Sequence, residues 1–322
     1  MITKELPIVS IICTCFNQEA FVLEALQSVV DQSYQGIEII VIDDYSTDSS
    51  YERIQSFAKK YKIIKVVKNE MNLALCKNFN HGLKLSSGKY VIDFSCDDVL
   101  LPDRVKEQVD FFESLPSDIG VIFSNAEYID EQGINHHYFY PLDHERLAIE
   151  KPPSGDIYNQ LIDRYFISTP SMMMKQEMLL QLGGYDEALA FEDFDFWIRS
   201  SRDWKYAYQD EILTKVRLTL GSLSGGYDHK NEDQLMSTYE ICRKIKALNK
   251  TAEEDSALIR RLEYEIKHAV LANKRKEADL LLQLLCEMQS LSLTRKFLSE
   301  LNKTSLKTGW LRDFVIKFRA KV

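Results

Sequence analysis

No segment of this 322-residue sequence is apolar enough to cross a membrane. A membrane-spanning helix needs about 18 or more consecutive apolar residues, and the apolar runs here are far shorter. The first residues, MITKELPIVS, also lack the basic and apolar regions of a secretory signal peptide. We therefore expect a cytoplasmic protein.

Two common patterns for metals and cofactors are missing as well. The six cysteines contain no CxxC pair, so we expect reduced structural thiols and no zinc site. Neither GxGxxG nor GxxxxGKS/T occurs, which excludes the glycine-rich loops of dinucleotide-binding and P-loop proteins. A site for phosphate groups would therefore need another source of positive charge.

Charge is divided unequally along the chain. The net charge is −9, but residues 241–322 hold 18 Lys and Arg against 10 Asp and Glu, a net of +8. Residues 1–240 therefore carry −17. An acidic body repels nucleic acid, so we expect no nucleic-acid partner, whereas the basic end could meet an anionic membrane or another protein.

The first third of the chain alternates between strand and helix patterns. Continuous apolar runs predict strands at 7–13, 37–43, 62–68, 89–94 and 120–123. Helical spacing predicts helices at 19–32, from about Ser46, at 74–86 and from Pro102. This order predicts an α/β fold with a Rossmann-like, mostly parallel sheet flanked by helices. Ligands of such sheets gather beyond the carboxyl ends of the strands.

The pattern changes twice after residue 124. Residues 125–229 are less regular, with turns such as KPPSGD and GGYDE, and residues 230–307 are helical almost throughout. We expect one domain at residues 1–229, which consists of two halves at about 1–124 and 125–229. A helical C-terminal region follows at 230–322.

Polar residues follow three of the predicted strands, as CTCFN (13–17), DDYSTD (43–48) and SCDD (95–98). Each alone could cap a helix or shape a turn. Because the carboxyl ends of parallel strands share one edge, we expect the three to converge on a ligand site. Paired acids repel a diphosphate unless a divalent cation such as Mg²⁺ or Mn²⁺ lies between them, so the pattern favours a metal-assisted phosphate site.

The stretch FEDFDFWIRS (191–200) places three acids among aromatic residues, with the spacing of a short helix. A carboxylate against Phe and Trp suits a general base, because apolar surroundings raise its pKa. The alternative is that Glu192 and Asp193 only begin a helix whose aromatic residues are core.

Six blocks together resemble family 2 glycosyltransferases with the GT-A fold, in the family's order and at familiar spacings. They cover about residues 6–225 and read VSIICTCFNQEAFVLEALQSVVDQSY, IEIIVIDDYSTD, NLALCKNFNHGLKLSSGKYV, SCDDVLLPDR, GGYDE and FEDFDFW. The resemblance implies an inverting enzyme that transfers a sugar from a nucleotide sugar, which we expect to be UDP-linked, to a glycan or lipid-linked acceptor. Polysaccharide or glycolipid biosynthesis would be its setting. Residues 1–124 would form the nucleotide-binding half and 125–229 the acceptor half.

The resemblance also implies roles for individual residues. The side chains matched to the nucleotide are Thr14 and Phe16 along it, Asp44 at the uridine base edge, Lys77 toward the phosphates and Asp97 at the ribose. Asp98 would hold Mn²⁺ or Mg²⁺, and Asp193 would be the catalytic base.

Two departures from the family pattern bear on the metal. Ser95 stands where many members have the first acid of the motif, and Thr219 stands where some relatives carry a His. These changes keep a non-catalytic, glycosyltransferase-like assembly protein open as an alternative. A nucleotidyltransferase is the other enzymatic alternative, although CTCFNQEA lacks that class's glycine-rich, basic loop.

The last residues, KTSLKTGWLRDFVIKFRAKV (303–322), combine aromatic and basic side chains with a single acid. Such a helix could lie on the inner face of a membrane, near a lipid-linked acceptor. The alternative, which the sequence slightly favours because Trp and Phe are also ordinary interface residues, is that it docks on the acidic body of the protein or forms a homodimer interface.

Overall fold

The computed structural model describes residues 6–219 and 232–289, which divide into two compact units. The first unit holds the described residues up to Ile157, together with Phe166–Ala188 and the residues from Asp195 to 219. The second unit holds Tyr158–Tyr165, Leu189–Phe194 and residues 232–289. Residues 189–194 thus group with the C-terminal helices, although they precede the predicted boundary near 230. That boundary stays a prediction.

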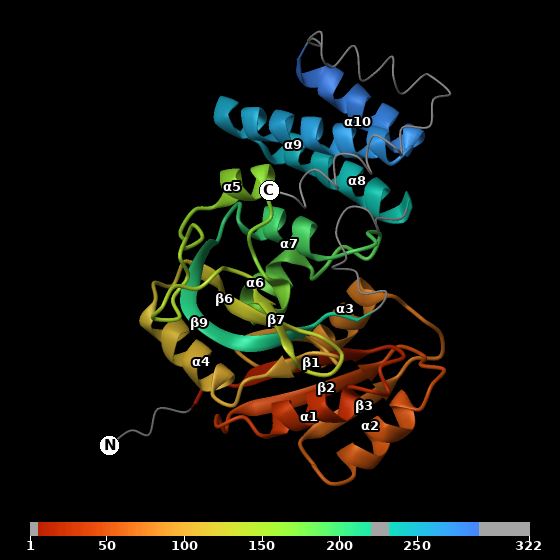
Figure 1. Ribbon diagram of the computed structural model, residues 1–322, viewed down its shortest axis with the longest axis vertical. Coiled ribbons are helices and arrows are strands. Elements are labelled where there is room, and N and C mark those ends of the chain that lie inside the picture. Colours follow the sequence, from red (N-terminus) through yellow and green to blue (C-terminus); the bar gives the residue numbers. More distant parts are fainter. Residues whose placement is uncertain (1–5, 220–231, 290–322) are drawn as a thin grey trace. The chain divides into compact units, whose positions relative to one another are not determined.

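The first unit is built on one mixed sheet (Figure 1). Its strand order is β3-β2-β1-β4-β8-β6-β9-β5, with β7 paired to β6. The pairs β3-β2, β2-β1, β1-β4 and β6-β9 are parallel, and β8 joins β4 to β6 in antiparallel fashion. The strands are β1 (Val9–Cys15), β2 (Ile37–Asp43), β3 (Ile64–Lys68), β4 (Tyr90–Ser95), β5 (Val99–Leu100), β6 (Ile119–Ile129), β7 (Asn135–Tyr138), β8 (Met173–Lys175) and β9 (Lys205–Arg217).

Helices cover both faces of the parallel strands. Apolar side chains of α1 (Val22–Val30), α2 (Ser50–Ala58) and α4 (Arg104–Ser114) share one core with alternate residues of β1, β2 and β4. The opposite face is covered by α3 (Leu75–Leu85), whose Gly82 lies so close to the sheet that a Cβ would be 2.4 Å from Ile12 Cγ2. The unit also contains α6 (Gln176–Leu182) and most of α7 (Asp193–Ser200).

The second unit is helical. It consists of α5 (Tyr158–Asp163), α8 (Glu232–Leu248), α9 (Ala252–Leu271) and α10 (Arg275–Met288), with α9 packed against the other three. Thr251 and Glu254 form a reciprocal capping box at the start of α9. Within these described ranges, no helix is long and apolar enough to span a membrane. The basic segment 303–322 lies outside the described residues.

The predicted elements of the first half are present, but several boundaries differ from the predicted ones. The strand expected at 120–123 extends to Ile129, and the helix expected from Pro102 begins at Arg104. The helix expected from Ser46 begins at Ser50, because residues 46 and 47 are bound elsewhere. Ser46 N–H donates to Asp43 Oδ2, and Thr47 N–H donates to Asn17 Oδ1. The acids and hydroxyls that looked like the start of a helix therefore form a fixed turn after β2.

Candidate active site

The polar ends of β1, β2 and β4 meet at one edge of the sheet, as the sequence predicts. Cys15 is paired with Asp43 on β2, and Thr14 is paired with Ser95 on β4, so the three strands end level with one another. Gln18 Nε2 donates to Ser95 Oγ at 3.2 Å, which joins the loop after β1 to the end of β4. The parallel register alone brings these distant residues together.

The turns after β1 and β2 hold each other in place. Asn17 has a left-handed backbone, with φ at 53°. Its N–H donates to Ser46 Oγ at 3.0 Å, and its side-chain oxygen accepts from Thr47 N–H at 2.8 Å. Both turns are therefore rigid before any ligand arrives.

Asp44 anchors the segment that follows β3. Its Oδ1 accepts from Asn69 Nδ2 at 2.9 Å and from Leu73 N–H at 2.7 Å, and its Oδ2 accepts from Ala74 N–H at 3.1 Å. A carboxylate offers about four lone-pair sites, so one remains after these three bonds. Asp44 therefore orients residues 69–74, and it is itself only 3% exposed. Its role at the base edge stays a prediction.

The other residues expected to bind the nucleotide differ in how far they are exposed to solvent. Thr14 is buried in β1, whereas Phe16 just beyond the strand is 46% exposed. Asp97 is half-buried beyond β4, and Lys77 is exposed on the first turn of α3. All belong to the first unit, and their contacts with a nucleotide stay predictions.

Arg217, at the end of β9, provides the positive charge beside the paired acids. Its backbone N–H donates to Asp98 Oδ1 at 2.9 Å, and its Nε donates to the carbonyl of Asp97 at 2.9 Å. The side chain also reaches Glu24 at 2.7 Å and lies over the ring of Phe21. Arg217 is only 3% exposed, so this cation is fixed in position.

Asp98 lies in an environment that resists its negative charge. Burial raises the pKa of Asp98 well above its ordinary value, and the neighbouring Asp97 raises it further. The Arg217 N–H and the charges of Arg104 and Arg217 act in the opposite direction. Arg104 is itself fully buried and donates to Gln108, Thr214 and Met172, so none of its hydrogen-bond acceptors among the described residues is a carboxylate.

A divalent metal fits this part of the site. No hydrogen bond from the described residues reaches Asp98 Oδ2, and the two adjacent acids are only partly compensated by Arg217 and Arg104. Within residues 6–219 and 232–289, no group of three His, Cys, Asp or Glu side chains forms a metal cage. Mg²⁺ and related ions are commonly held by one or two carboxylates plus substrate phosphates, so a single acid here is sufficient.

Asp193 begins α7 and belongs to the second unit. Its Oδ1 accepts from the N–H of Phe194 at 2.6 Å. Phe194 is fully buried, and its ring contacts Tyr165 edge-on and the guanidinium of Arg261 on α9. The predicted helix at FEDFDFWIRS is therefore present, and its aromatic residues are core. The catalytic role of Asp193 stays a prediction.

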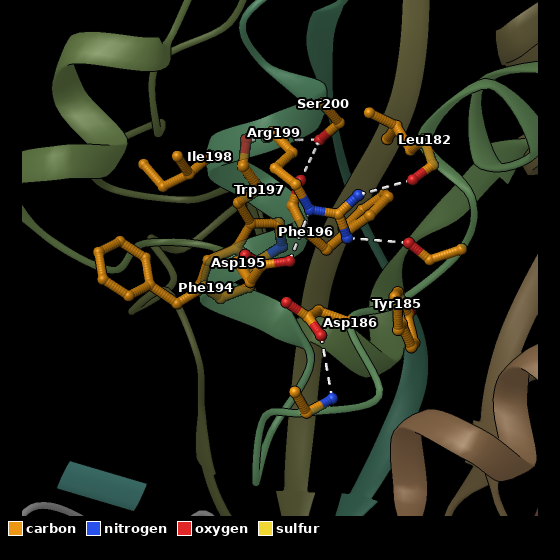
Figure 2. A network of polar contacts seen from close by, with 12 residues as sticks. Leu182, Tyr185, Asp186, Phe194, Asp195, Phe196, Trp197, Ile198, Arg199 and Ser200 are labelled. Atoms are coloured by element: carbon orange, nitrogen blue, oxygen red, sulfur yellow. Dashed lines mark hydrogen bonds and ion pairs between the residues drawn. The ribbon is translucent and has the colours of Figure 1, made fainter. Parts of the chain in front are cut away.

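The turn GGYDE is hydrogen-bonded by residues from two helices, and Figure 2 shows the contacts of one of them, Arg199. Arg199 on α7 bonds to Asp195 at 2.6 Å and donates to the carbonyls of Leu182 and Gly184. On the other side, Asn80 of α3 accepts from Tyr185 N–H and donates to the Tyr185 carbonyl.

Tyr185 links that turn to the sheet. Its ring stacks on Phe79, and its hydroxyl donates to Asp93 Oδ2 at 3.1 Å. Burial raises the pKa of Asp93 to about 7, while the bond from Tyr185 acts to lower it. Asp93, two residues before the end of β4, thus holds the GGYDE turn against the sheet through Tyr185.

Two residues of this edge were missed at the level of sequence. Arg217 stands two residues before Thr219, and nothing in the local sequence shows that it lies beside Asp97 and Asp98. Tyr45 follows Asp44 directly, has a left-handed backbone with φ at 64°, and is 48% exposed. An aromatic residue inside a DDYSTD turn is the signal that could have drawn attention to it.

Comparison with known proteins agrees with this geometry. Residues 10–182 match the family model for glycosyl transferase family 2. An uncharacterized glycosyltransferase of Methanocaldococcus jannaschii is 30% identical over 215 residues, which make up 66% of this chain and 71% of that protein. An uncharacterized glycosyltransferase of Haemophilus influenzae is 29% identical over 259 residues, or 76% of this chain and 74% of that protein.

Solved structures of the same fold are more distant in sequence. TarS residues 1–349 of S. aureus, in complex with UDP-GlcNAc, superimpose with a TM-score of 0.65 at 18% identity, covering 87% of this chain and 80% of that one. The mannosyltransferase PcManGT of Pyrobaculum calidifontis, in complex with GDP-Man and Mn²⁺, gives a TM-score of 0.59 at 13% identity, covering 92% and 84%. At these identities the likeness concerns the fold.

Proposed function

The chain belongs to glycosyl transferase family 2, and from this premise we propose that it transfers a sugar from a UDP-sugar to an acceptor hydroxyl with inversion. The observation that carries the proposal is the convergence of Phe16, Asp44, Asp97 and Asp98 at the carboxyl edge of β1, β2 and β4. Membership of this family leaves a nucleotidyltransferase without support.

The nucleotide would lie along this edge. Thr14 and Phe16 would border it, the remaining lone pair of Asp44 would accept a donor from the base, and Asp97 would accept from a ribose hydroxyl. Lys77, on the exposed first turn of α3, would approach the phosphates. UDP-GlcNAc accompanies TarS and GDP-Man accompanies the mannosyltransferase, so UDP and GDP are the first nucleotides to compare.

Asp98 would hold the divalent metal through its Oδ2, because its Oδ1 already accepts the Arg217 N–H. A bound Mn²⁺ or Mg²⁺ supplies positive charge to the leaving diphosphate. Arg217 keeps Asp98 in place through the backbone and holds the carbonyl of Asp97 through its side chain. Ser95, which replaces an acid of the usual motif, accepts from Gln18 and so contributes to the rigidity of the edge.

Asp193 would act as the general base. Its carboxylate would take the proton of the acceptor hydroxyl as that oxygen attacks the anomeric carbon, opposite the leaving nucleoside diphosphate. The acceptor would be a glycan or a lipid-linked sugar in polysaccharide or glycolipid biosynthesis. An enzyme with such a lipid-linked acceptor would work in the cytoplasm or at the inner face of the membrane.

Thermal unfolding in the presence of UDP, GDP and other nucleoside diphosphates, each with and without Mn²⁺, tests the donor site. We expect UDP with Mn²⁺ to give the largest rise in Tm. Asp98→Asn keeps an oxygen for the Arg217 N–H but removes the charge, so it should abolish the Mn²⁺-dependent part of the rise. Stabilisation by no nucleotide, or an undiminished Mn²⁺ effect in Asp98→Asn, would contradict the proposal.

A further inference from the structure

Strained backbone is concentrated at the edge of the sheet that carries the acids. Of the non-glycine residues described, five have a positive φ, and three of these are Asn17, Tyr45 and Ala74 at 53°, 64° and 66°. Asn17 follows β1, Tyr45 follows β2, and Ala74 lies in the segment after β3. Left-handed backbone is tolerated by Asn but is unfavourable for Tyr and Ala, because their Cβ atoms approach neighbouring backbone atoms.

Hydrogen bonds on both sides keep Tyr45 in this conformation. Before it, Asp44 is held by Leu73 N–H and Ala74 N–H. After it, Ser46 donates its N–H to Asp43 and accepts from the N–H of Asn17. Asp43 Oδ1 is buried without a hydrogen-bond partner among the described residues, which adds an electrostatic cost to the same turn. Backbone strain of this kind persists where the surroundings impose it, and it gathers at ligand sites.

The Tyr45 side chain makes no polar or aromatic contact with the described residues that would offset this strain. It is 48% exposed, and it makes no ring contact or hydrogen bond with the described part of the chain. Glycine or asparagine would adopt the same φ at lower cost. The turn therefore presents an aromatic ring toward solvent at the expense of stability.

Phe16 presents a second ring from the neighbouring strand. The Asp44 N–H donates to the carbonyl of Cys15 at 2.8 Å, so Phe16 and Tyr45 each follow one partner of this bond. Phe16 is 46% exposed. Asp44 directly precedes Tyr45. Its carboxylate can accept hydrogen bonds from the N–H groups of a base.

We propose that Tyr45 is a wall of the base-binding site, where its ring stacks on the heterocyclic base of the nucleoside diphosphate opposite the side bordered by Phe16. Aromatic rings stack on bases through dispersion and through exclusion of water. The strained turn arranges this wall in advance, so little order is lost when the nucleotide binds. This inference rests on the proposed nucleotide-sugar function and adds a base-recognition residue to it.

The test compares three variants of the full chain by thermal unfolding without ligand and by calorimetric titration with UDP and Mn²⁺. Tyr45→Asn removes the ring and relieves the strain, so it should unfold at a higher temperature but bind UDP about tenfold more weakly. Tyr45→Phe keeps the ring and should match the wild type in both measurements. Arg146→Gly relieves strain at a φ of 64° in a residue that makes no bond to Asp44, so it should raise the unfolding temperature and leave the affinity unchanged.

Titration with pyrophosphate and Mg²⁺ separates the base from the phosphates, and Tyr45→Asn should bind this probe as the wild type does. Equal UDP affinity in Tyr45→Asn and wild type would overturn the inference while leaving the proposed function intact. An equal loss of UDP and pyrophosphate affinity would also overturn it, because the variant would then disturb the whole edge. A wild type that binds no nucleoside diphosphate would remove the proposed function together with this inference.

Discussion

Asp98 and Arg217 are joined through the backbone of β9 and not through a direct ion pair. Arg217 N–H donates to Asp98 Oδ1 at 2.9 Å, while the guanidinium turns away to the carbonyls of Asp97 and Asp130 and to Glu24. The arrangement brings positive charge close to the two acids without occupying Asp98 Oδ2. A carboxylate oxygen thus stays available to a metal in an otherwise buried site.

The Arg217 side chain should contribute strongly to folding. Arg217→Met keeps the backbone bond to Asp98 but leaves the carbonyls of Asp97 and Asp130 without this donor. Since a hydrogen bond from a charged group contributes about 1.5–3 kcal/mol, we expect the free energy of unfolding to fall by at least about 2 kcal/mol. Urea denaturation measures this change. Arg217→Lys should recover only a small part of it, because a lysine cannot reproduce the fork of donors.

Lys215→Met is the matched control, since Lys215 precedes Arg217 by two residues on β9 and pairs with Glu127 at only 3.9 Å. Its free energy of unfolding should stay within about 0.5 kcal/mol of wild type. Equal destabilisation by the two substitutions would contradict a special role for Arg217.

The parallel half of the fold could be predicted from sequence because each of its elements has a local signal. Continuous apolar runs predict β1, β2 and β4. Parallel strands end at one edge of a sheet, and this rule correctly predicts that Thr14, Asp43 and Ser95 lie close together. The start of α2 was placed too early because hydroxyl and acidic residues favour a fixed turn as well as a helix start. Local composition does not distinguish the two when Asn17, the partner, lies 30 residues from Thr47.

The partners of the acids could not be predicted, because they depend on pairings across long stretches of sequence. Arg217 is 119 residues from Asp98, and Asn80 is 105 residues from Tyr185. The assignment of Leu189–Phe194 to the same unit as α8, α9 and α10 also has no local signal. Periodicity identifies a helix, but it does not say which distant residue its side chains will contact.

Asp193 should be required for transfer and dispensable for donor binding. Asp193→Asn keeps an oxygen for the Phe194 N–H but cannot take a proton, so kcat should fall by about 10²- to 10⁴-fold. The UDP affinity in Mn²⁺ and the melting temperature should stay close to wild type. Asp203→Asn, an exposed acid beyond α7, is the control and should leave kcat unchanged. A kcat near wild type in Asp193→Asn would rule out its role as general base.

Asp93 should make stability depend on pH. Its pKa is raised by burial to about 7 in the folded protein, against about 3.9 in an unfolded chain. Between about pH 4 and pH 7, Asp93 is therefore protonated in the folded state but ionised in the unfolded state. The stabilising contribution is full below pH 4 and is lost as the pH rises toward 7.

Asp93→Asn removes this titration, so its free energy of unfolding should decline less than that of wild type between pH 5 and pH 8, by more than about 1 kcal/mol. Tyr185→Phe removes the donor to the Asp93 anion and should raise the folded-state pKa further, so the decline should extend to higher pH than in the wild type. Urea denaturation at a series of pH values measures both effects. Parallel pH profiles for wild type and Asp93→Asn would contradict the prediction.

The second unit should depend on a buried ion pair within α9. Arg261 Nε lies 3.0 Å from Glu265 Oε1, and both side chains are buried, at 3% and 1% exposure. The guanidinium also lies over the rings of Tyr165 and Phe194, at 4.0 Å and 4.5 Å from their centroids. Arg261→Met leaves the Glu265 carboxylate without this cation and should cost about 3–5 kcal/mol of stability.

Replacing both members, as Arg261→Met with Glu265→Leu, should cost clearly less than the single change, because no isolated charge then remains buried. Arg260→Met is the control on the same helix, since Arg260 pairs with Asp163 at the surface and should contribute less than about 1 kcal/mol. Thermal and urea unfolding of the three variants measure these differences. If the double variant were less stable than Arg261→Met, the attraction within the pair would exceed the cost of burying it, contrary to this expectation.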